Sequence, residues 1–269
     1  MIKNMGFMVF VLKLAPIFLK FVKSVKMIKI ALGAGSMLAY SYLFTWQFAF
    51  ILILSIVFHE YGHITGMKNR GMKTKGIFLI PFVGGAAVPE GNFKNRGDET
   101  YVSLMGPYYG LLLAIPFLAY GIIYESALSI GLVSFMALIN LFNLLPINPL
   151  DGGRVLKSIA FSLNTKLGLI VLFGGILAGI GIVYYYKIWL LLFVLVIGAI
   201  ELFFEYLDYK KVKGTENFHL IDEKRMNNGE MIKYSLYYVT LIIAFVGLIF
   251  YTGKYEGADL ALKVLTDKV

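Results

Sequence analysis

The sequence predicts an α-helical membrane protein with several transmembrane helices and a small membrane-associated β-hairpin. Of its 269 residues, 59% are hydrophobic and only 15% are charged, and the mean hydropathy is +0.76. A soluble domain is about half apolar and about a quarter charged, so this composition excludes an ordinary soluble enzyme. It also excludes a disordered protein, because disordered chains are poor in apolar residues.

Seven blocks of the sequence are apolar enough and long enough to form helices that cross the hydrocarbon core, which takes about 20 residues. They are residues 28–44, 47–67, 101–123, 128–148, 167–185, 188–206 and 234–252. Polar residues near position 45 separate the first two blocks. Because about 40 residues are too many for one span, we expect a tight turn there rather than one long helix. The sequence therefore predicts about seven transmembrane helices.

The N-terminal segment, residues 1–27, differs from these blocks. Its apolar run is interrupted by four lysines, Lys13, Lys20, Lys23 and Lys26. Pro16 breaks any helix near the middle of the segment. A cleavable signal peptide has an uninterrupted apolar core, so we expect instead a basic amphipathic segment on the membrane surface. An eighth span is the alternative, and it would place a lysine inside the bilayer.

Basic residues are distributed unequally between the two sides of the predicted helices. Twenty-one Lys and Arg residues fall on the side of the N-terminus and four on the other side. Basic loops stay in the cytoplasm, so we expect a multi-pass protein of the plasma membrane with a cytoplasmic N-terminus. The net charge of +9 therefore flanks apolar blocks, and it predicts the lipid bilayer as a partner rather than nucleic acid.

Two stretches between the blocks are neither transmembrane helices nor simple loops. Residues 76–89 are apolar but short and rich in Gly and Pro, which predicts two strands joined by a turn at Gly84 and Gly85. A polar stretch after the sixth block predicts a solvated cytoplasmic connection, and we expect no added soluble domain. The predicted parts are an N-terminal segment, a core, this connection, and a last helix with its tail, at residues 1–27, 28–206, 207–233 and 234–269.

The clearest chemical signal is the run His59-Glu60-Tyr61-Gly62-His63 near the end of the second block. Positions i and i+4 of a helix share a face, so His59 and His63 can direct two imidazole nitrogens at one metal ion. Glu60 then lies beside that metal, where a carboxylate can take a proton from water. The chain has three histidines and no cysteine, which excludes thiolate sites and cysteine nucleophiles. Two neutral histidines hydrogen-bonded to neighbouring helices are the alternative.

Two histidines leave a zinc ion short of a third protein ligand. Acidic residues near the membrane are the candidates: Asp98, Glu99, Glu125, Asp151, Glu201, Glu205 and Asp208. Glu125 falls on the outer side, and we expect Asp98 and Glu99 in a charged, solvated turn. Glu201 and Glu205 are a rival pair one turn apart, although a polar helix end that reaches the cytosol is the simpler interpretation.

Asp151 has the most suitable context for a third ligand. It follows a segment in which Pro146 and Pro149 interrupt the helix, so the chain unwinds at membrane depth. Irregular backbone persists there only where it lines a cavity or is buried in protein. We therefore favour Asp151 as the third ligand, and its other expected role is the N-cap of a helix at 152–163.

The two motifs together resemble a known family. His-Glu-x-x-His in a membrane helix, followed about 90 residues later by Asn-x-x-Pro-x-x-Pro-Leu-Asp-Gly-Gly, is similar to the site-2 protease family of intramembrane zinc metalloproteases. The resemblance covers residues 28–163 and includes Gly106-Pro107 in the intervening helix. The apolar hairpin resembles that of a short bacterial branch, and we expect no PDZ or CBS domain.

The resemblance implies both an activity and a set of site residues. The activity is hydrolysis of peptide bonds within or near the transmembrane segments of single-span membrane proteins, at a site open to the cytoplasm. The resemblance makes Glu60 the catalytic carboxylate, and it gives one Zn²⁺ ion three ligands, His59, His63 and Asp151. It assigns substrate binding to Asn143 and Pro149.

Three other functions stay open at this point. A membrane metalloprotease with a glutamate as third ligand needs Glu201 or Glu205 near the histidines. A zinc transporter or sensor needs a polar path across the bilayer, and most of the apolar blocks carry few ionisable groups. A scaffold without proteolytic activity has no need of Glu60.

Overall fold

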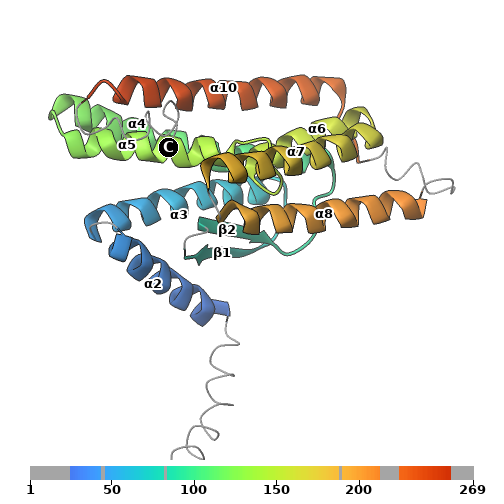
Figure 1. Cartoon of the computed structure of the whole chain (residues 1–269), viewed down its shortest axis with the longest axis horizontal. Coiled ribbons are helices and arrows are strands. Elements are labelled where there is room, and N and C mark those ends of the chain that lie inside the picture. The colour runs from blue at the N-terminus through green and yellow to red at the C-terminus, as the bar shows by residue number, and fades with distance from the viewer. Residues whose placement is uncertain (1–24, 44–45, 82–83, 188–189, 213–223, 256–269) are drawn as a thin grey trace, which may run out of the picture.

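The chain folds into a bundle of long helices with one small β-hairpin beside it (Figure 1). The computed structural model describes residues 25–43, 46–81, 84–187, 190–212 and 224–255. Most of the predicted surface segment at 1–27 therefore lies outside the described residues. Its amphipathic character stays a prediction.

Eight helices and two strands are present in the described part of the chain. The helices are α2 (Val25–Leu43), α3 (Trp46–Asn69), α4 (Arg96–Ile123), α5 (Ala127–Asn143), α6 (Asp151–Leu163), α7 (Thr165–Tyr186), α8 (Leu190–Val212) and α10 (Asn228–Thr252). The strands are β1 (Thr74–Ile80) and β2 (Gly84–Pro89).

The predicted apolar blocks each coincide with a helix, but several ends differ. The fourth block was expected to run to residue 148, and α5 ends at Asn143 because Pro146 and Pro149 follow. The predicted connection at 207–233 is too long, since α8 continues to Val212 and α10 begins at Asn228.

Four helices are long and apolar enough to cross a membrane, among the residues that the structure describes. They are Ala49–Asn69, Arg96–Ile123, Thr165–Tyr185 and Asn228–Thr252. The helix α5 is apolar but shorter. Large apolar side chains on the outside of α7 and α10, such as Phe173, Leu177, Leu236 and Ile243, are exposed, as expected for a surface that faces lipid. The predicted multi-pass helical membrane protein is confirmed, and the count of seven spans stays a prediction.

Small residues allow α3 and α4 to pack closely against each other. A side chain at Gly62 would place its Cβ 2.2 Å from the carbonyl oxygen of Met105, and one at Gly66 would lie 3.1 Å from the Met105 side chain. Glycines four residues apart on one face let two helix backbones approach, which is a common way of packing helices in membranes. This contact brings the histidines of α3 against α4.

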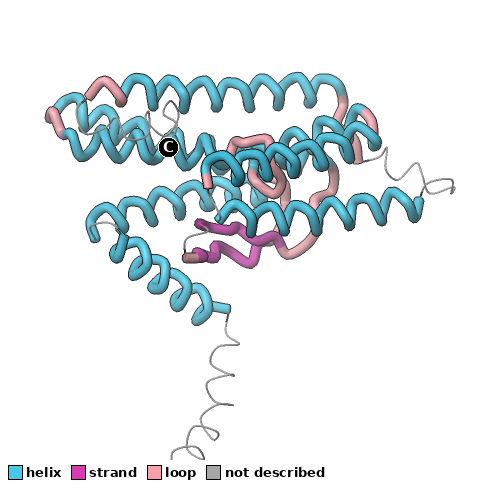
Figure 2. Tube along the Cα trace, in the orientation of Figure 1, coloured by secondary structure: helices cyan, strands magenta, loops and turns pink. Residues whose placement is uncertain are grey.

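The hairpin lies beside α3 (Figure 2), and its turn is not where the sequence predicted it. Gly84 pairs with Ile80 and Gly85 with Leu79, so both glycines belong to β2 rather than to the turn. Gly85 has another role: a Cβ there would lie 2.4 Å from the Glu60 side chain. The strand can therefore approach the α3 helix closely at this point.

A buried cluster of charges joins α4, α6 and α8. Lys157 lies 2.6 Å from Glu99 and 2.5 Å from Glu201, while Arg96 binds Glu205 through two hydrogen bonds of 3.0 Å. Burial alone would lower the pKa of the Lys157 ammonium, but the nearby carboxylates outweigh burial and raise it. The cluster holds α8 against the rest of the bundle.

This cluster corrects the expected position of two acidic residues. Asp98 and Glu99 were expected in a solvated turn, and both are buried in the first turn of α4. Arg70 lies 3.3 Å from the Asp98 carboxylate. Arg70 and Lys157 come from elsewhere in the chain, so local sequence did not indicate burial.

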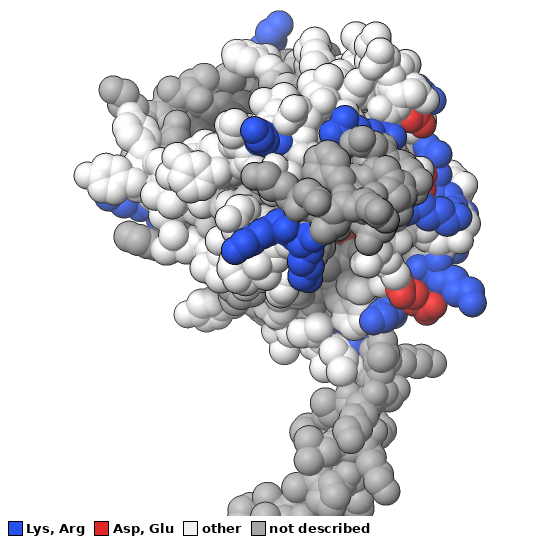
Figure 3. All heavy atoms as spheres, turned by 90° about the vertical axis from the view of Figure 1, so that its right-hand side faces the viewer, with Lys and Arg blue, Asp and Glu red and all other residues white. Residues whose placement is uncertain are grey.

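Basic side chains gather at one end of the bundle. Figure 3 views the end where α8 finishes and α10 begins, and Lys and Arg outnumber Asp and Glu on this face. The sequence placed the loops at this end on the cytoplasmic side. The sidedness itself stays a prediction.

Replacing Lys157 by Met should destabilise the fold. Lys157 is 2% exposed, and its removal leaves buried carboxylates without their cation, which costs about 3–5 kcal/mol. Unfolding of the purified protein in detergent measures the change. Lys166→Met is the control, because Lys166 is exposed at the start of α7. An equal loss of stability in both variants would contradict a structural role for the cluster.

Candidate metal centre

The helix α3 supplies three neighbouring polar side chains. His59, Glu60 and His63 are buried in the last part of this otherwise apolar helix. The Nε2 atoms of His59 and His63 lie 3.1 Å apart, as expected for residues one turn apart on one face. Each of the three residues offers a ligand atom, and these atoms all lie within 4.8 Å of one another.

Asp151 reaches the two histidines from the first residue of α6. Its Oδ2 atom lies 3.1 Å from the His59 Nε2 and 3.4 Å from the His63 Nε2. The helix begins after an unwound segment at 144–150, which is anchored by a 2.6 Å hydrogen bond from the Tyr238 hydroxyl to the Leu144 carbonyl. The N-cap of α6 is Leu150, and Asp151 forms no side-chain cap.

These three ligand atoms have the spacing of a zinc site. Ligands about 2.0–2.1 Å from a tetrahedral zinc ion lie about 3.3 Å from one another. The three separations here are 3.1, 3.1 and 3.4 Å, so the atoms occupy three corners of such a tetrahedron. Two imidazoles and one carboxylate are also ligands that zinc prefers. The residues present therefore fit one zinc ion with a fourth position open.

Hydrogen bonds on the far side of each ring leave both Nε2 atoms free to bind a metal. His63 donates from Nδ1 to the carbonyl oxygen of Val102 at 2.8 Å. Asn140 donates from its amide to the Met136 carbonyl, so its Oδ1 accepts from the Nδ1 of His59 at 2.8 Å. Such partners fix the tautomer and orientation of metal-binding histidines.

Glycines on α4 make room for this arrangement. A Cβ at Gly106 would lie 2.3 Å from the His63 Nε2 and 2.7 Å from the His59 Nε2. A Cβ at Gly110 would lie 2.1 Å from the Oδ1 of Asn140. A side chain at either position would displace a ligand or its hydrogen-bond partner.

The Glu60 carboxylate lies beside the histidines and reaches the hairpin. Its Oε2 accepts a 2.6 Å hydrogen bond from the backbone N–H of Ala87 in β2. Ala87 pairs with Ile77 of β1, and its N–H is directed outward at Glu60, so this edge of β2 faces the site. The carboxylate thus lies between the histidines and a strand edge.

The other predicted residues form no hydrogen bond or ion pair with the ligands in the described part of the chain. Asn143 is the last residue of α5 and is half-buried, whereas Asn140, one turn earlier, contacts His59. Pro149 is also half-buried, in the unwound segment. Glu201 accepts hydrogen bonds from Asn148 and Lys157, and it is therefore engaged in the ion cluster.

Sequence reasoning missed Asn140. Its signal was an asparagine inside an apolar helix, a residue that needs a buried hydrogen-bond partner. The sequence predicted a role for Asn143 at the start of the second motif, and Asn140 lies just before that motif.

Gly106→Ala should abolish zinc binding, because the added methyl group would occupy the space at the two Nε2 atoms. Metal analysis of the purified protein measures zinc per chain. Gly174→Ala in α7 is the control, since nothing lies within 4 Å of a Cβ there. Full zinc content in Gly106→Ala would contradict this geometry.

Asn140→Leu should weaken zinc binding by about 10–100-fold, the usual effect of removing a partner of a metal-binding histidine. Competition with a chelator measures the affinity. Asn143→Leu should leave the affinity unchanged, because Asn143 does not contact either histidine ring. Equal losses in both variants would remove the specific role of Asn140.

Sequence comparisons point to the same chemistry. Residues 47–129 match the family model described as Peptidase family M50, which is the site-2 protease family. This range includes His59, Glu60, His63 and all of α4, and it ends before Asp151.

Two curated relatives share part of the chain. A zinc metalloprotease of Methanocaldococcus jannaschii is 31% identical over 152 residues, which are 49% of this chain and 44% of that protein. Stage IV sporulation protein FB of Bacillus subtilis is 33% identical over 127 residues, 44% of this chain and 43% of that protein. The chain thus spans less than half the length of these relatives. The resemblance to the site-2 protease family is confirmed by these matches.

Proposed function

We propose that the protein is an intramembrane zinc metalloprotease that hydrolyses peptide bonds within or near the transmembrane segments of membrane proteins. The observation that carries this proposal is the convergence of His59, His63 and Asp151 within 3.4 Å, with the Glu60 carboxylate beside them. The M50 match and the relative named as a zinc metalloprotease support it.

The residues divide the chemistry between them. His59, His63 and Asp151 hold zinc, which lowers the pKa of a water molecule and polarises a carbonyl group. Glu60 is positioned to take the proton of the attacking water and to deliver it to the leaving amine. Buried surroundings strengthen both interactions, because the local dielectric constant is low.

The hairpin offers a place for an unwound substrate. A helical substrate hides its carbonyl groups in internal hydrogen bonds, so it has to open before hydrolysis. The outer edge of β2 carries the Ala87 N–H, and an extended peptide can pair with such an edge. A peptide bound there accepts the hydrogen bond that the Ala87 N–H otherwise donates to Glu60, and it lies next to the ligand triad. Asn143 and Pro149 remain the proposed substrate contacts from the unwound segment.

The finer features of the sequence prediction belong to this proposal as well. They are seven spans, a plasma-membrane location, a cytoplasmic opening of the site, and single-span proteins as substrates. The gathering of Lys and Arg at the end of the bundle where α8 finishes and α10 begins supports the orientation (Figure 3).

The alternative functions are less well supported. A glutamate as third ligand is disfavoured because Glu201 and Glu205 bind Lys157 and Arg96 instead. Transport or sensing would leave Glu60 without a task, and so would a scaffold. The matched family and its relatives favour proteolysis.

Glu60→Gln should bind zinc normally and lose cleavage by at least about 10²-fold, because the amide cannot accept the proton. Co-expression with a panel of tagged single-span proteins, followed by immunoblotting, measures cleavage. Zinc per chain is measured on the same purified variant. Retained proteolysis would remove Glu60 from its catalytic role.

Asp151→Ala should reduce bound zinc, since the ion loses one of three protein ligands. Glu201→Gln is the matched control and should keep its zinc, because Glu201 binds Lys157. Zinc loss only in the Glu201 variant would make the glutamate the third ligand. Metal analysis of both variants decides between them.

A further inference from the structure

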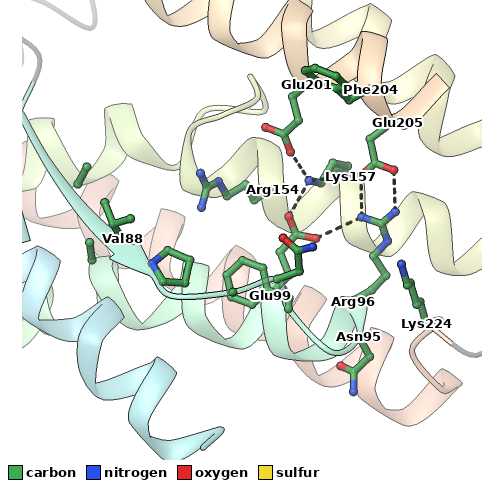
Figure 4. Close-up of a pocket in the computed structure, with 16 residues that line it drawn as sticks. Val88, Asn95, Arg96, Glu99, Arg154, Lys157, Glu201, Phe204, Glu205 and Lys224 are labelled. Atoms are coloured by element: carbon green, nitrogen blue, oxygen red, sulfur yellow. Dashed lines mark hydrogen bonds and ion pairs between the residues drawn. The ribbon is translucent and has the colours of Figure 1, made fainter. Parts of the chain in front are cut away.

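A cavity of about 580 Å³ with charged side chains in its lining opens between β2, α4, α6 and α8 (Figure 4). Residues of β2 form one wall, from Ala86 to Pro89. Charged side chains form the opposite side, where Arg96, Glu99, Arg154 and Lys157 are labelled in Figure 4. This cavity plays no part in the metal chemistry described above.

The cavity begins next to the proposed catalytic residues. Ala87 lines it and also donates its N–H to Glu60, so the two sites share one strand. Arg154 follows Asp151 by three residues on α6, which is about 4.5 Å along the helix and close to the same face. A peptide that passes the ligand triad along β2 therefore continues into the cavity.

All three carboxylates of the cavity already have partners. Glu99 and Glu201 bind Lys157, and Glu205 binds Arg96 through both carboxylate oxygens. These ion pairs are drawn as dashed lines in Figure 4. They lie on one side of the cavity and satisfy two of its cations.

Arg154 and Lys224 are the remaining cations. Neither has an ion-pair partner within 4.0 Å among the described residues, and both line the cavity. In Figure 4 the Arg154 guanidinium is directed away from the ion pairs and towards the space beside β2. A guanidinium has five N–H donors in a planar fork that matches a carboxylate. With four cations and three carboxylates in its lining, the cavity has one positive charge in excess.

We propose that this cavity binds the peptide segment flanking the cleaved bond and that Arg154 selects an acidic side chain in that segment. This inference rests on the proposed protease function. An extended chain advances about 3.3 Å per residue, so the acidic side chain lies within a few residues of the cleaved bond.

The charge of the cavity also disfavours, as substrates, membrane proteins with basic cytoplasmic flanks, which are the most common kind. Their cytoplasmic flanks are rich in Lys and Arg, and such flanks would meet two unpaired cations here. Rejection of unsuitable partners by like charges is a general route to specificity. Selection by Arg154 therefore works in two ways, by attraction of acidic flanks and repulsion of basic ones.

Binding to an inactive enzyme tests the proposal directly. The full chain carrying Glu60→Gln is purified in detergent and titrated against fluorescent peptides of Ala, Val and Gly with a central pair of Asp, Asn or Lys. We expect the Asp peptide to bind about tenfold more tightly than the Asn peptide, and the Lys peptide most weakly. Fluorescence anisotropy measures each affinity.

Substitutions of Arg154 identify the residue responsible. In the Glu60→Gln protein, a second substitution Arg154→Gln should remove the preference for the Asp peptide. Arg154→Glu should reverse the preference in favour of the Lys peptide. Lys166→Gln, exposed on α7 outside the cavity, is the matched control and should keep the preference. Zinc per chain should stay constant in all of these variants.

Several outcomes would overturn the proposal. An equal affinity for Asp and Lys peptides would do so, and so would an unchanged preference in Arg154→Gln. Zinc loss in Arg154→Gln would mean that Arg154 supports Asp151 instead of the substrate. These results concern peptide and zinc binding, so they can be distinguished from a failure of the protein to cleave substrates.

Cleavage assays keep the two proposals apart. In the active enzyme, Arg154→Gln should raise KM about tenfold for a substrate with an acidic flank and leave kcat nearly unchanged. Absence of all cleavage alongside discriminating peptide binding would reject the protease and keep the cavity. Cleavage that requires Glu60 but ignores the flank charge would keep the protease and reject the role of Arg154.

Discussion

The meeting of two imidazoles and one carboxylate inside a bundle of helices is the constraint on which the rest of the structure depends. Buried polar groups cost free energy unless each one has a partner. The free nitrogens of His59 and His63 and an oxygen of Asp151 face one another, so one divalent cation satisfies all three. Val102 and Asn140 orient the two rings through hydrogen bonds to their Nδ1 atoms. Gly106 on α4 leaves space for the two Nε2 atoms.

The helix α6 links this centre to a second cluster of charges that cannot be a metal site. Asp151 begins the helix, and Lys157 lies nearly two turns later among three carboxylates. The ammonium group takes the position that a cation would otherwise occupy, and Arg96 supplies a second positive charge to Glu99 and Glu205. One cluster therefore has the geometry to bind an ion, and the other links α8 to α4 and α6. Arg154 stands between them on the same helix, without an ion pair in the described part of the chain.

Sequence reasoning succeeded where the signal is local and failed where it depends on distant partners. The apolar blocks predict the helices, because their length matches a membrane span. The i, i+4 spacing of His59 and His63 predicts their shared face. The helix interruption at Pro146 and Pro149 predicts the placement of Asp151. Burial of Glu99 was missed because its partner Lys157 is 58 residues away. Asn140 was missed for the same reason, since its partner His59 lies on another helix.

In the proposed protease, the strand β2 connects the reaction to the choice of substrate. One residue of its edge, Ala87, holds the Glu60 carboxylate, and the same residue lines the cavity that contains Arg154. A peptide paired with this edge has its carbonyl groups directed along the strand at fixed intervals of about 3.3 Å per residue. The position of its flank in the cavity then determines which carbonyl group lies at the ligand triad. Because one strand sets both positions, a flank that does not fit the cavity also misplaces the bond to be cleaved, and binding energy far from the reacting atoms is used to orient them.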